Sequence, residues 1–506
     1  MPASFLHGVE VIELNAGPRP VTVVKSAVIG LVGTAPIWSV ASPPAIDAPV
    51  LVSSAPDAAQ FGPLIKGYTI PYALAAIQAQ GAGQVIVVNV FDPAAHTSAV
   101  AATPYTFGTT GIGAGKINLG HMGVSQVVVT SDPAGTTYAA GTDYTLDAVN
   151  GIITLVGSGR INAGATVLVS FEYADPSRVA DSDVIGTFAN GTYSGLQALK
   201  TTYGTMGFFA RILIAPGYAH NPDVASALTS MANTLRAMAL IDSAPGTTSA
   251  AAIANRGSAG AAFDTSSNRA VLCFPQQIFV DQGIDPATGA PVGGNSVAPL
   301  SQYVAGAMAA KDLAQGYWWS PSNTQFEGAL GPDVALYASI IDSTSDVNTL
   351  NSEGILTVFN SFGTGLRVWG NRSAAYPTST APDNFISIRR TMDVIEDSVE
   401  LAMLQFIDQP ISNALITAIL ASVNSFIRTL IQRGALVGGS ASYDPAQNPP
   451  SQVAAGQLVF DIDVMPPPPA ERISFNVTID TNLLQQLGQS NPLGSSLSSA
   501  AAAANL

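Results

Sequence analysis

A glycine-rich segment is the first place in this sequence where chemistry could reside. Residues 111–116 read Gly-Ile-Gly-Ala-Gly-Lys, superficially like the loop that cradles a nucleotide phosphate. That loop requires a glycine at position 110 and a serine or threonine at position 117, where this chain has Thr110 and Ile117. The segment also lies among short β-branched runs and not at a strand-to-helix turn. The pattern therefore argues against a phosphate site.

Other reactive groupings are equally incomplete. No Gly-x-Ser-x-Gly nucleophile motif occurs in the sequence. Asp461 and Asp463 share one side of an expected strand, but their regular alternation with apolar neighbours favours a solvated strand face. No histidine has a second histidine, a cysteine or paired carboxylates at ligand spacing; the histidines are His7, His96, His121 and His220. We therefore expect no catalytic residue, no metal site and no cofactor, while an α/β enzyme with an unrecognised site stays open as an alternative.

The composition points to a protein that covers its surface with copies of itself. Charged residues make up 10% of the 506 positions, whereas soluble domains usually carry about 25%. The net charge of −15 disfavours a nucleic-acid partner, because phosphate contacts need clustered lysine and arginine. A large enzyme with a neutral exterior is the alternative that composition leaves open.

Cysteine usage and the N-terminus bear on the compartment. The single cysteine, Cys273, lies in an apolar run that predicts a buried strand, and it has no partner for an intramolecular disulfide. Residues 1–8 lack a basic stretch followed by an apolar core, so we expect no signal peptide. The apolar run 409–427 is long enough to span a membrane, but its polar interruptions favour an amphipathic helix, and we expect no membrane insertion.

The elements of the body alternate between strands and helices. Continuous apolar runs at 27–32, 84–90, 238–241 and 271–274 predict strands buried on both faces. Helical spacing predicts helices over 72–80, 222–235 and 297–315. This alternation indicates a layered α/β fold. Between about 94 and 176 it is replaced by short β-branched runs, and Asn150-Gly151 predicts a tight hairpin there. We interpret this block as an inserted all-β domain.

The last third of the chain has a different organisation. Two helices are expected, over about 392–406 and 415–430, and then a strand that includes Phe460, Ile462 and Val464. Pro466–Pro469 favour an extended spacer. Beyond it, apolar residues alternate with polar ones in an expected strand whose apolar members are Ile473, Phe475, Val477 and Ile479.

Several segments together resemble a contractile tail sheath protein, the type found in phages with contractile tails and in R-type bacteriocins. The most specific is the N-terminal stretch, His7-Gly-Val-Glu-Val-Ile-Glu-Leu14 followed by Gly17-Pro-Arg-Pro20 and by residues 27–36. Further matches are Trp319–Asn323, Asn351–Ile355, Arg367–Arg372 and the helix opening at Ile388-Arg-Arg390. The inserted block is a departure from compact members of that family.

The resemblance implies a structural subunit and not an enzyme. It implies that strands at both ends of the chain pair with small sheets in neighbouring copies. Its partners would be copies of itself, a tail tube protein, and baseplate and terminator proteins. It further implies assembly in the host cytoplasm into a virion tail. A capsid or fibre protein is the other structural alternative.

The resemblance also assigns residues to these contacts. The N-terminal arm would use Gly8, Val9, Val11, Ile12 and Leu14, and the C-terminal arm the alternating residues of 473–479. Phe460, Ile462 and Val464 would form the acceptor strand. Arg389, Arg390, Arg428 and Arg433 are candidates for contacting an acidic tube, although they could equally pair internally or cap helix ends.

The resulting fold class is a mixed α/β multidomain protein with an inserted all-β domain and extended terminal arms. The expected divisions are an N-terminal arm at 1–24, a discontinuous body at 25–93 and 178–350, the insertion at 94–177, an inner C-terminal domain at 351–465 and a C-terminal arm at 466–506.

Overall fold

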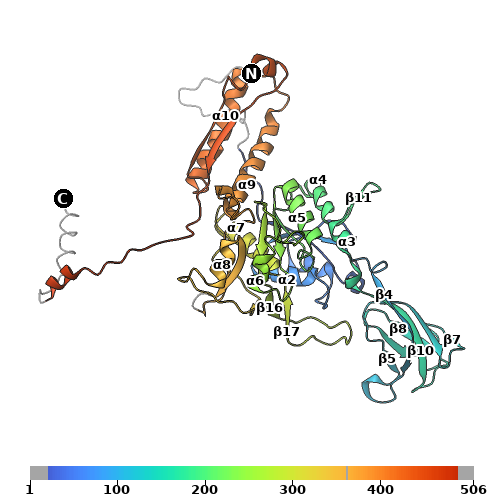
Figure 1. Cartoon of the computed structure of the whole chain (residues 1–506). Coiled ribbons are helices and arrows are strands. Elements are labelled where there is room, and N and C mark those ends of the chain that lie inside the picture. The colour runs from blue at the N-terminus through green and yellow to red at the C-terminus, as the bar shows by residue number, and fades with distance from the viewer. Residues whose placement is uncertain (1–20, 361–362, 488–506) are drawn as a thin grey trace, which may run out of the picture. The chain divides into compact units, whose positions relative to one another are not determined.

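The computed structural model describes residues 21–360 and 363–487. The chain divides into two compact units, Met1–Pro469 and Ala470–Leu506. Figure 1 shows the path of the chain through its helices and strands.

The first unit is built on a nine-stranded sheet. Its six central strands are parallel and lie in the order β3 (Gln84–Asn89), β1 (Val28–Gly33), β13 (Ile212–Ile214), β14 (Met238–Asp242), β15 (Ala270–Cys273) and β20 (Ile355–Asn360). Antiparallel strands close its two sides, with β2 (Val50–Val52) beside β3, and β21 (Leu366–Trp369) and β18 (Thr324–Gln325) beyond β20. The predicted strands at 27–32, 84–90, 238–241 and 271–274 are confirmed, and Cys273 is buried as expected.

Helices cover both faces of this sheet, which explains why its central strands are mostly apolar. On one face, α2 (Ile70–Ala79) and α7 (Leu300–Ala314) share a core with Val271 and Cys273 of β15. The other face receives α5 (Pro222–Leu235), α6 (Ser249–Ala254) and α8 (Asp346–Ser352), and Leu272 of β15 lies there. Shorter helices are α1 (Ala55–Ala58), α3 (Asp181–Ile185) and α4 (Thr202–Met206).

Two predicted helix starts in the body were wrong, and α2 begins at Ile70 and not at Tyr72. Helix α7 begins at Leu300 and not at Val297, because Asn295–Ala298 forms β17. Strand β17 pairs with β16 (Gln277–Val280), and β19 (Gly331–Pro332) pairs with the other side of β16. This small sheet adjoins α2, since Phe279 of β16 meets the ring of Tyr72 edge-on.

The β-rich block contains two sheets around a core of its own. One sheet has the order β4 (Thr97–Thr106), β10 (Thr166–Ala174), β6 (Val124–Ser131), β7 (Thr137–Tyr138), and the other β5 (Lys116–Asn118), β9 (Ile152–Leu155), β8 (Tyr144–Asp147). Their shared core includes Phe107, Val129, Ile153 and Phe171. A hairpin joins β8 and β9 at Asn150-Gly151 as predicted, but its loop has four residues, 148–151, and not the two of a tight turn. Gly151 has φ +64°, and a β-carbon there would lie 1.9 Å from the carbonyl oxygen of His121, so only glycine fits.

The C-terminal region contains two long helices and a two-stranded hairpin. Helix α9 (Ile386–Met403) starts earlier and ends earlier than predicted, and α10 (Asn413–Gln432) follows it. The hairpin pairs β22 (Gly438–Ser442) with β23 (Asp461–Met465), and α11 (Pro450–Ala454) lies in its connection.

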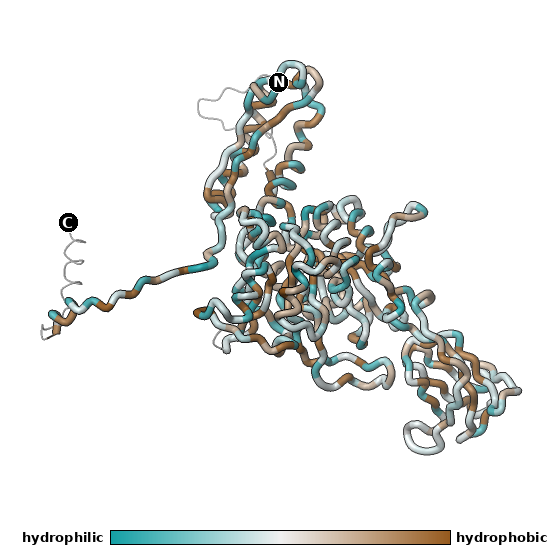
Figure 2. Tube along the Cα trace, in the orientation of Figure 1, coloured by the Kyte–Doolittle hydropathy of each residue, from teal (hydrophilic) through white to brown (hydrophobic). Residues whose placement is uncertain are grey.

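The second unit has no strand among its described residues. Residues 470–480 carry no regular hydrogen-bonded structure, so the strand predicted at 473–479 is absent from the single chain. A strand needs a neighbour for its backbone hydrogen bonds, and this segment has none within the described chain. Figure 2 shows the alternation of hydrophobic and hydrophilic residues along it.

Candidate inter-subunit interface

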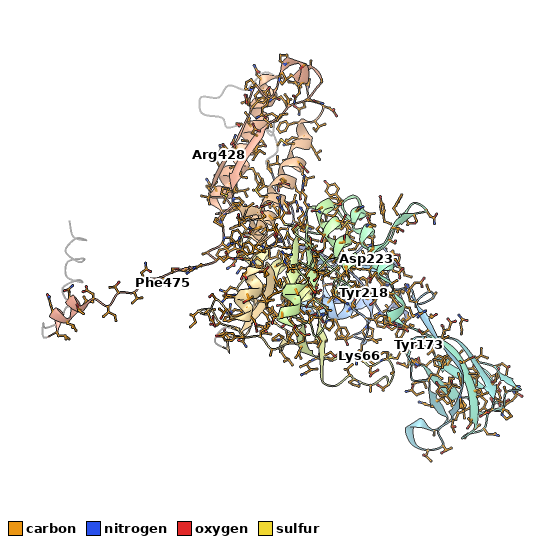
Figure 3. The ribbon with its side chains drawn as sticks, viewed as in Figure 1. Lys66, Tyr173, Tyr218, Asp223, Arg428 and Phe475 are labelled. Carbon is orange, nitrogen blue, oxygen red and sulfur yellow. The ribbon has the colours of Figure 1, made fainter. Side chains whose placement is uncertain are left out.

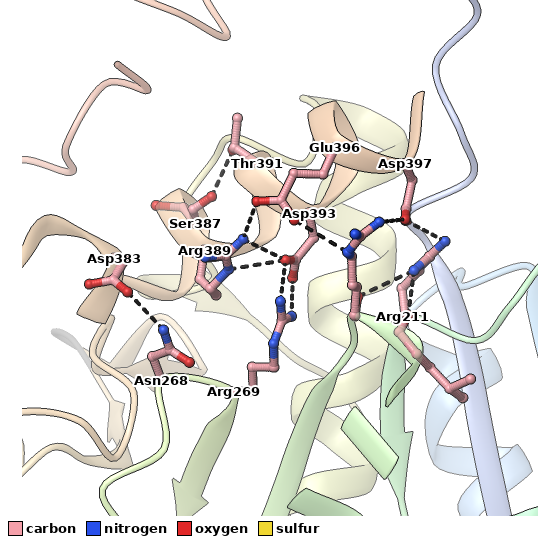
Figure 4. A network of polar contacts seen from close by, with 12 residues as sticks. Arg211, Asn268, Arg269, Asp383, Ser387, Arg389, Thr391, Asp393, Glu396 and Asp397 are labelled. Atoms are coloured by element: carbon pink, nitrogen blue, oxygen red, sulfur yellow. Dashed lines mark hydrogen bonds and ion pairs between the residues drawn. The ribbon is translucent and has the colours of Figure 1, made fainter. Parts of the chain in front are cut away.

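Helix α9 is fixed to the body by a network of ion pairs, drawn in Figure 4. Asp393 occupies its centre and receives Nη2 of Arg269 at 2.7 Å and Nη2 of Arg389 at 2.7 Å. Arg389 also donates to Glu396 at 2.9 Å. Because Asp393 is only 3% exposed, these charge-assisted bonds form in a largely water-excluded site and hold α9 in one position.

A second part of the network lies one turn further along α9. Arg236, which follows α5, donates to Asp397 at 2.8 Å and to both carboxylate oxygens of Glu400 at 2.7 Å. Arg211 pairs with Asp397 as well. The hydrogen bonds from Arg236 hold the pKa of Glu400 below its usual value. The network contains four arginines and four carboxylates, and its most buried carboxylates, Asp393 and Asp397, would be costly to bury without these partners.

The next arginine on α9 is also engaged inside the chain. Arg390 is 4% exposed and donates Nη1 to Asp312 of α7 at 2.7 Å. Its Nη2 reaches the carbonyl of Ser26 at 3.2 Å, and the backbone N–H of Val24 donates to Ser398 Oγ at 3.2 Å. The start of the described chain is thus bound along α9. Arg389 and Arg390 pair internally, the alternative that the sequence left open for them.

Helix α10 presents the two remaining arginines. Arg428 and Arg433 are exposed, and Figure 3 labels Arg428. The opposite stripe of α10, including Leu415, Val423, Phe426 and Ile427, is buried with Ile395 of α9. In the described ranges α10 is the one helix with the length and hydropathy of a membrane span. Its apolar stripe packs on α9 and the hairpin, as an amphipathic helix does in a folded domain.

A side chain of α10 makes the two hydrogen bonds to the hairpin that the backbone of a neighbouring strand would make. Asn424 of α10 donates Nδ2 to the carbonyl of Ala441 at 2.9 Å and accepts the Ala441 N–H at its Oδ1 at 2.9 Å. Both backbone groups of Ala441 therefore point away from β23. Since Ala441 is paired with Ile462, the backbone groups of Ile462 must point to the other edge of the hairpin.

This geometry leaves the outer edge of β23 open. Val464 lies two residues from Ile462, so its N–H and C=O point to the same edge. In the part of the chain that the structure describes, no further strand joins this sheet. Phe460 and Val464 pack beside the α9–α10 core, while Asp461 and Asp463 lie on the opposite side of the strand. The predicted acceptor residues thus border an edge that can accept another strand.

The C-terminal segment exposes a row of apolar side chains. Ile473, Phe475, Val477 and Ile479 are 70%, 85%, 89% and 91% exposed, and Figure 3 labels Phe475. Such a row is an aggregation hazard unless a second surface covers it. The predicted N-terminal arm residues, Gly8 to Leu14, lie outside the described residues.

The described residues offer no grouping suited to a metal ion. Sequence reasoning missed the carboxylates of the α9 network and the role of Asn424. Nothing in the spacing connects Arg390 with Asp312, 78 positions away. The only available signal for Asn424 was that a polar amide interrupts an apolar helical run.

Family models match three parts of the chain. The phage tail sheath protein central domain matches residues 191–374, and the phage tail sheath C-terminal domain matches residues 378–480. Residues 93–180 match a model described as a protein of unknown function. The third match covers the β-rich block.

Relatives and solved structures point the same way. A tail sheath protein of Burkholderia phage BcepMu is 47% identical over 97% of this chain and 100% of its own length. The tail sheath protein of Escherichia phage P2 is 27% identical over 60% of this chain and 72% of its own length. Among solved structures, the contracted sheath of the extracellular contractile injection system PVC matches with TM-score 0.57, 16% identity, 95% of this chain and 99% of its own. The contracted helical sheath of the anti-feeding prophage matches with a TM-score of 0.56 and 15% sequence identity. The match covers 94% of this chain and 100% of that chain.

Proposed function

This chain belongs to the phage tail sheath protein family, and we propose that its copies are joined through the open edge of β23. As a contractile tail sheath subunit it is a component of the virion. Family membership favours the sheath over the capsid and fibre alternatives. In the proposal, Ile473–Ile479 of one copy adds as a strand beside β23 of a neighbour, and Gly8–Leu14 forms a second link of the same kind.

The open edge at Ile462 and Val464 is the observation that carries the proposal. A strand added there gains main-chain hydrogen bonds, and its alternating side chains determine the register. With Phe475 and Val477 on the α10 side, the apolar layer formed by Phe460 and Val464 would be extended. The polar residues Ser474 and Asn476 would then lie beside Asp461 and Asp463.

The prolines indicate that the acceptor belongs to another copy. Pro466–Pro469 follow β23 directly. Their fixed φ favours an extended spacer and prevents the tight reversal that would fold residues 473–479 back onto their own strand. The segment would therefore reach a neighbouring subunit.

Contraction would move the bodies while these links stay paired. The ion pairs of α9 support treating the body, α9 and α10 as one rigid piece. We propose that the subunits polymerise around a tail tube and shorten as near-rigid bodies to drive the tube through the host envelope. Repacked contacts, with no nucleotide consumed, would supply the free energy. Assembly in the host cytoplasm and contacts with baseplate and terminator proteins belong to the same proposal, and Arg428 and Arg433 stay candidates for the tube contact.

A charge placed on the apolar row tests the link. Phe475→Asp should abolish the hollow striated tubes that we expect in negative-stain electron microscopy of the concentrated chain, because its 85% exposed side chain would be buried in the polymer. Thr478→Asp is the matched control, with the same charge on the polar side of the same segment, and it should still polymerise. Normal tubes from Phe475→Asp would contradict the proposal.

A further inference from the structure

A pocket of about 360 Å³ lies at the carboxyl ends of the parallel strands. Its wall includes Pro216 and Gly217, shortly after β13, and Gln276, shortly after β15. Thr69, also on the wall, accepts the N–H of Thr34, the residue after β1, at 3.0 Å. Sites for small molecules in proteins have volumes of about 300–1,000 Å³, so this pocket is large enough for a small ligand.

This edge of the central sheet contains its topological switch point. After β1 the chain forms β3 on one side of that strand, and it then crosses to β13 on the other side. In open α/β sheets, ligands bind beyond the carboxyl ends of the strands at such a point. The pocket therefore occupies the position at which sheets of this kind hold small molecules, and the chemistry of its wall indicates which molecule fits.

One carboxylate on the pocket wall differs from the other buried carboxylates of the described chain. Three of those are paired with arginines, namely Asp143, Asp312 and Asp393. Burial raises the pKa of a fourth, Asp242, to about 7. Asp281 is 4% exposed, and no ion pair joins it to a cation within the described residues. Burial opposes its ionisation, but hydrogen bonds and the charge of Lys66 outweigh burial and hold the pKa of Asp281 below its usual value. A buried charge of this kind is normally paired.

The Asp281 carboxylate can accept a further hydrogen bond. Its Oδ1 accepts the Tyr72 hydroxyl and the Gly283 N–H, both at 2.8 Å, and its Oδ2 accepts the Ser296 hydroxyl at 2.6 Å. A carboxylate offers about four acceptor positions, so one position on Oδ2 remains. Gln276 is 4% exposed, and because its Nε2 donates to a backbone carbonyl at 2.8 Å, its Oε1 is a second acceptor on the wall. Both acceptors suit an ammonium group, which only donates.

Lys66 places the opposite charge on the same wall, and Figure 3 labels it. Its side chain is exposed and makes no ion pair with any described residue. Burial lowers the pKa of His220, so Lys66 and Asp281 are the charged side chains of this wall near pH 7. Apolar groups, among them the ring of Phe279 and Ala298, complete the wall. A wall with one charge of each sign suits a zwitterion better than a bare amine or a bare acid.

We propose that this pocket binds a small zwitterion of the class of apolar α-amino acids, with its ammonium group at Asp281 and its carboxylate toward Lys66. The side chain of the ligand would lie against Tyr72 and Phe279, whose ring centroids are 5.7 Å apart in an edge-on arrangement. The ammonium group would give Asp281 the paired charge that the other buried carboxylates obtain from arginines. Binding requires no neighbouring copy, so this inference and the arm link can fail independently.

Isothermal titration calorimetry of the full chain, below the concentration at which tubes form, tests the pocket with three matched probes. They are L-leucine, isoamylamine, which lacks the carboxylate, and isocaproate, which lacks the ammonium group. Leucine should bind at least about tenfold more tightly than either analogue, because each analogue leaves one charge of the wall unpaired. No binding of leucine, or binding of either analogue as tight as that of leucine, would overturn the proposal.

Two substitutions separate the contributions of the two charges. Lys66→Met should weaken leucine binding at least about tenfold without weakening isoamylamine binding, because only the carboxylate loses its partner. Asp281→Asn should weaken the binding of both amines at least about tenfold, and its melting temperature shows whether this variant folds. Lys116→Met, at an exposed lysine of the β-rich block, is the matched control and should change neither affinity. Unchanged leucine binding by Lys66→Met would overturn the proposal, and since Lys66 is exposed this test does not depend on the folding of Asp281→Asn.

Discussion

The strands of the central sheet and of the β22–β23 hairpin all need partners for their backbone N–H and C=O groups, and the two regions differ in where these partners come from. Every central strand has a neighbour on both sides, and helices cover both faces. The hairpin has two strands, one edge contacted by Asn424 and one edge open. A two-stranded ribbon is marginal by itself, so the hairpin depends on α10 and on added strands. The sheet of the body is thus fully paired within one chain, whereas the C-terminal hairpin keeps one edge open, and the proposed assembly would fill that edge.

The largest effect on stability is expected from breaking the buried pair between α9 and the body. Arg390→Ala leaves the Asp312 carboxylate, whose side chain is 1% exposed, without its partner. An uncompensated buried charge should lower the free energy of unfolding by about 3–5 kcal/mol. Denaturant titration measures it. Arg433→Ala is the exposed control and should change the free energy by less than about 0.5 kcal/mol. Equal effects would show that the body and α9 are not coupled through this pair.

The free energy of unfolding should depend on pH through a carboxyl group of the central sheet. Burial raises the pKa of Asp242, at the end of β14, to about 7, while Ser301 donates to it from its N–H and hydroxyl at the start of α7. The folded chain then holds this proton more tightly than the unfolded chain. The contribution of this group to the free energy of unfolding should therefore be greatest near pH 4 and fall as the pH rises to about 7. Its size is about 1.4 kcal/mol for each unit by which the pKa in the folded chain exceeds the pKa in the unfolded chain.

Asp242→Asn should flatten that dependence. Melting temperatures of wild type and variant, measured across this pH range, provide the comparison. A wild-type curve that is flat or rises from pH 4 to 7 relative to the variant would contradict the assignment.

A smaller effect is expected at the amide clamp of the hairpin. Asn424→Ala removes two hydrogen bonds to Ala441, each worth about 1 kcal/mol where water cannot replace it. Amide hydrogen exchange at residues 438–442 should become faster, with little change in the central strands. Asn413→Ala, at the exposed start of the same helix, is the control. Unchanged exchange at 438–442 would mean that the clamp does not support the hairpin.

The smallest effect on stability should come from removing residues 1–20. The truncated chain should keep the melting temperature of the body, because Val24 and Ser26 still hold α9 in place. It should fail to polymerise, because it lacks the proposed N-terminal arm. Calorimetry and negative-stain microscopy of the same sample separate the two properties. Tubes from the truncated chain would remove the N-terminal arm from the model of assembly.

The sequence predicted what local patterns determine. Apolar runs predicted β1, β3, β14 and β15, and Asn150-Gly151 predicted a hairpin because positive φ is required there. Strand β4 was missed, since its Ala- and Thr-rich residues are mostly exposed and show no clear alternation. Residue patterns predicted the proposed interface as a row of apolar residues at 473–479, and the family resemblance added Phe460, Ile462 and Val464 as the acceptor strand. Its open edge depends on Asn424 meeting Ala441, a contact between a helix and a strand that leaves no periodic signal in the sequence.

The four prolines after β23 have a mechanical consequence for the polymer. An extended polyproline segment of four residues spans about 12 Å and resists both compression and stretching. In the proposed polymer, such a strut would hold a nearly constant distance between the hairpin of one copy and the strand given to the next. If the lattice changed its dimensions, the strut would not absorb the change in length. The displacement would then appear as rotation at its two ends, so a shortening sheath would also twist.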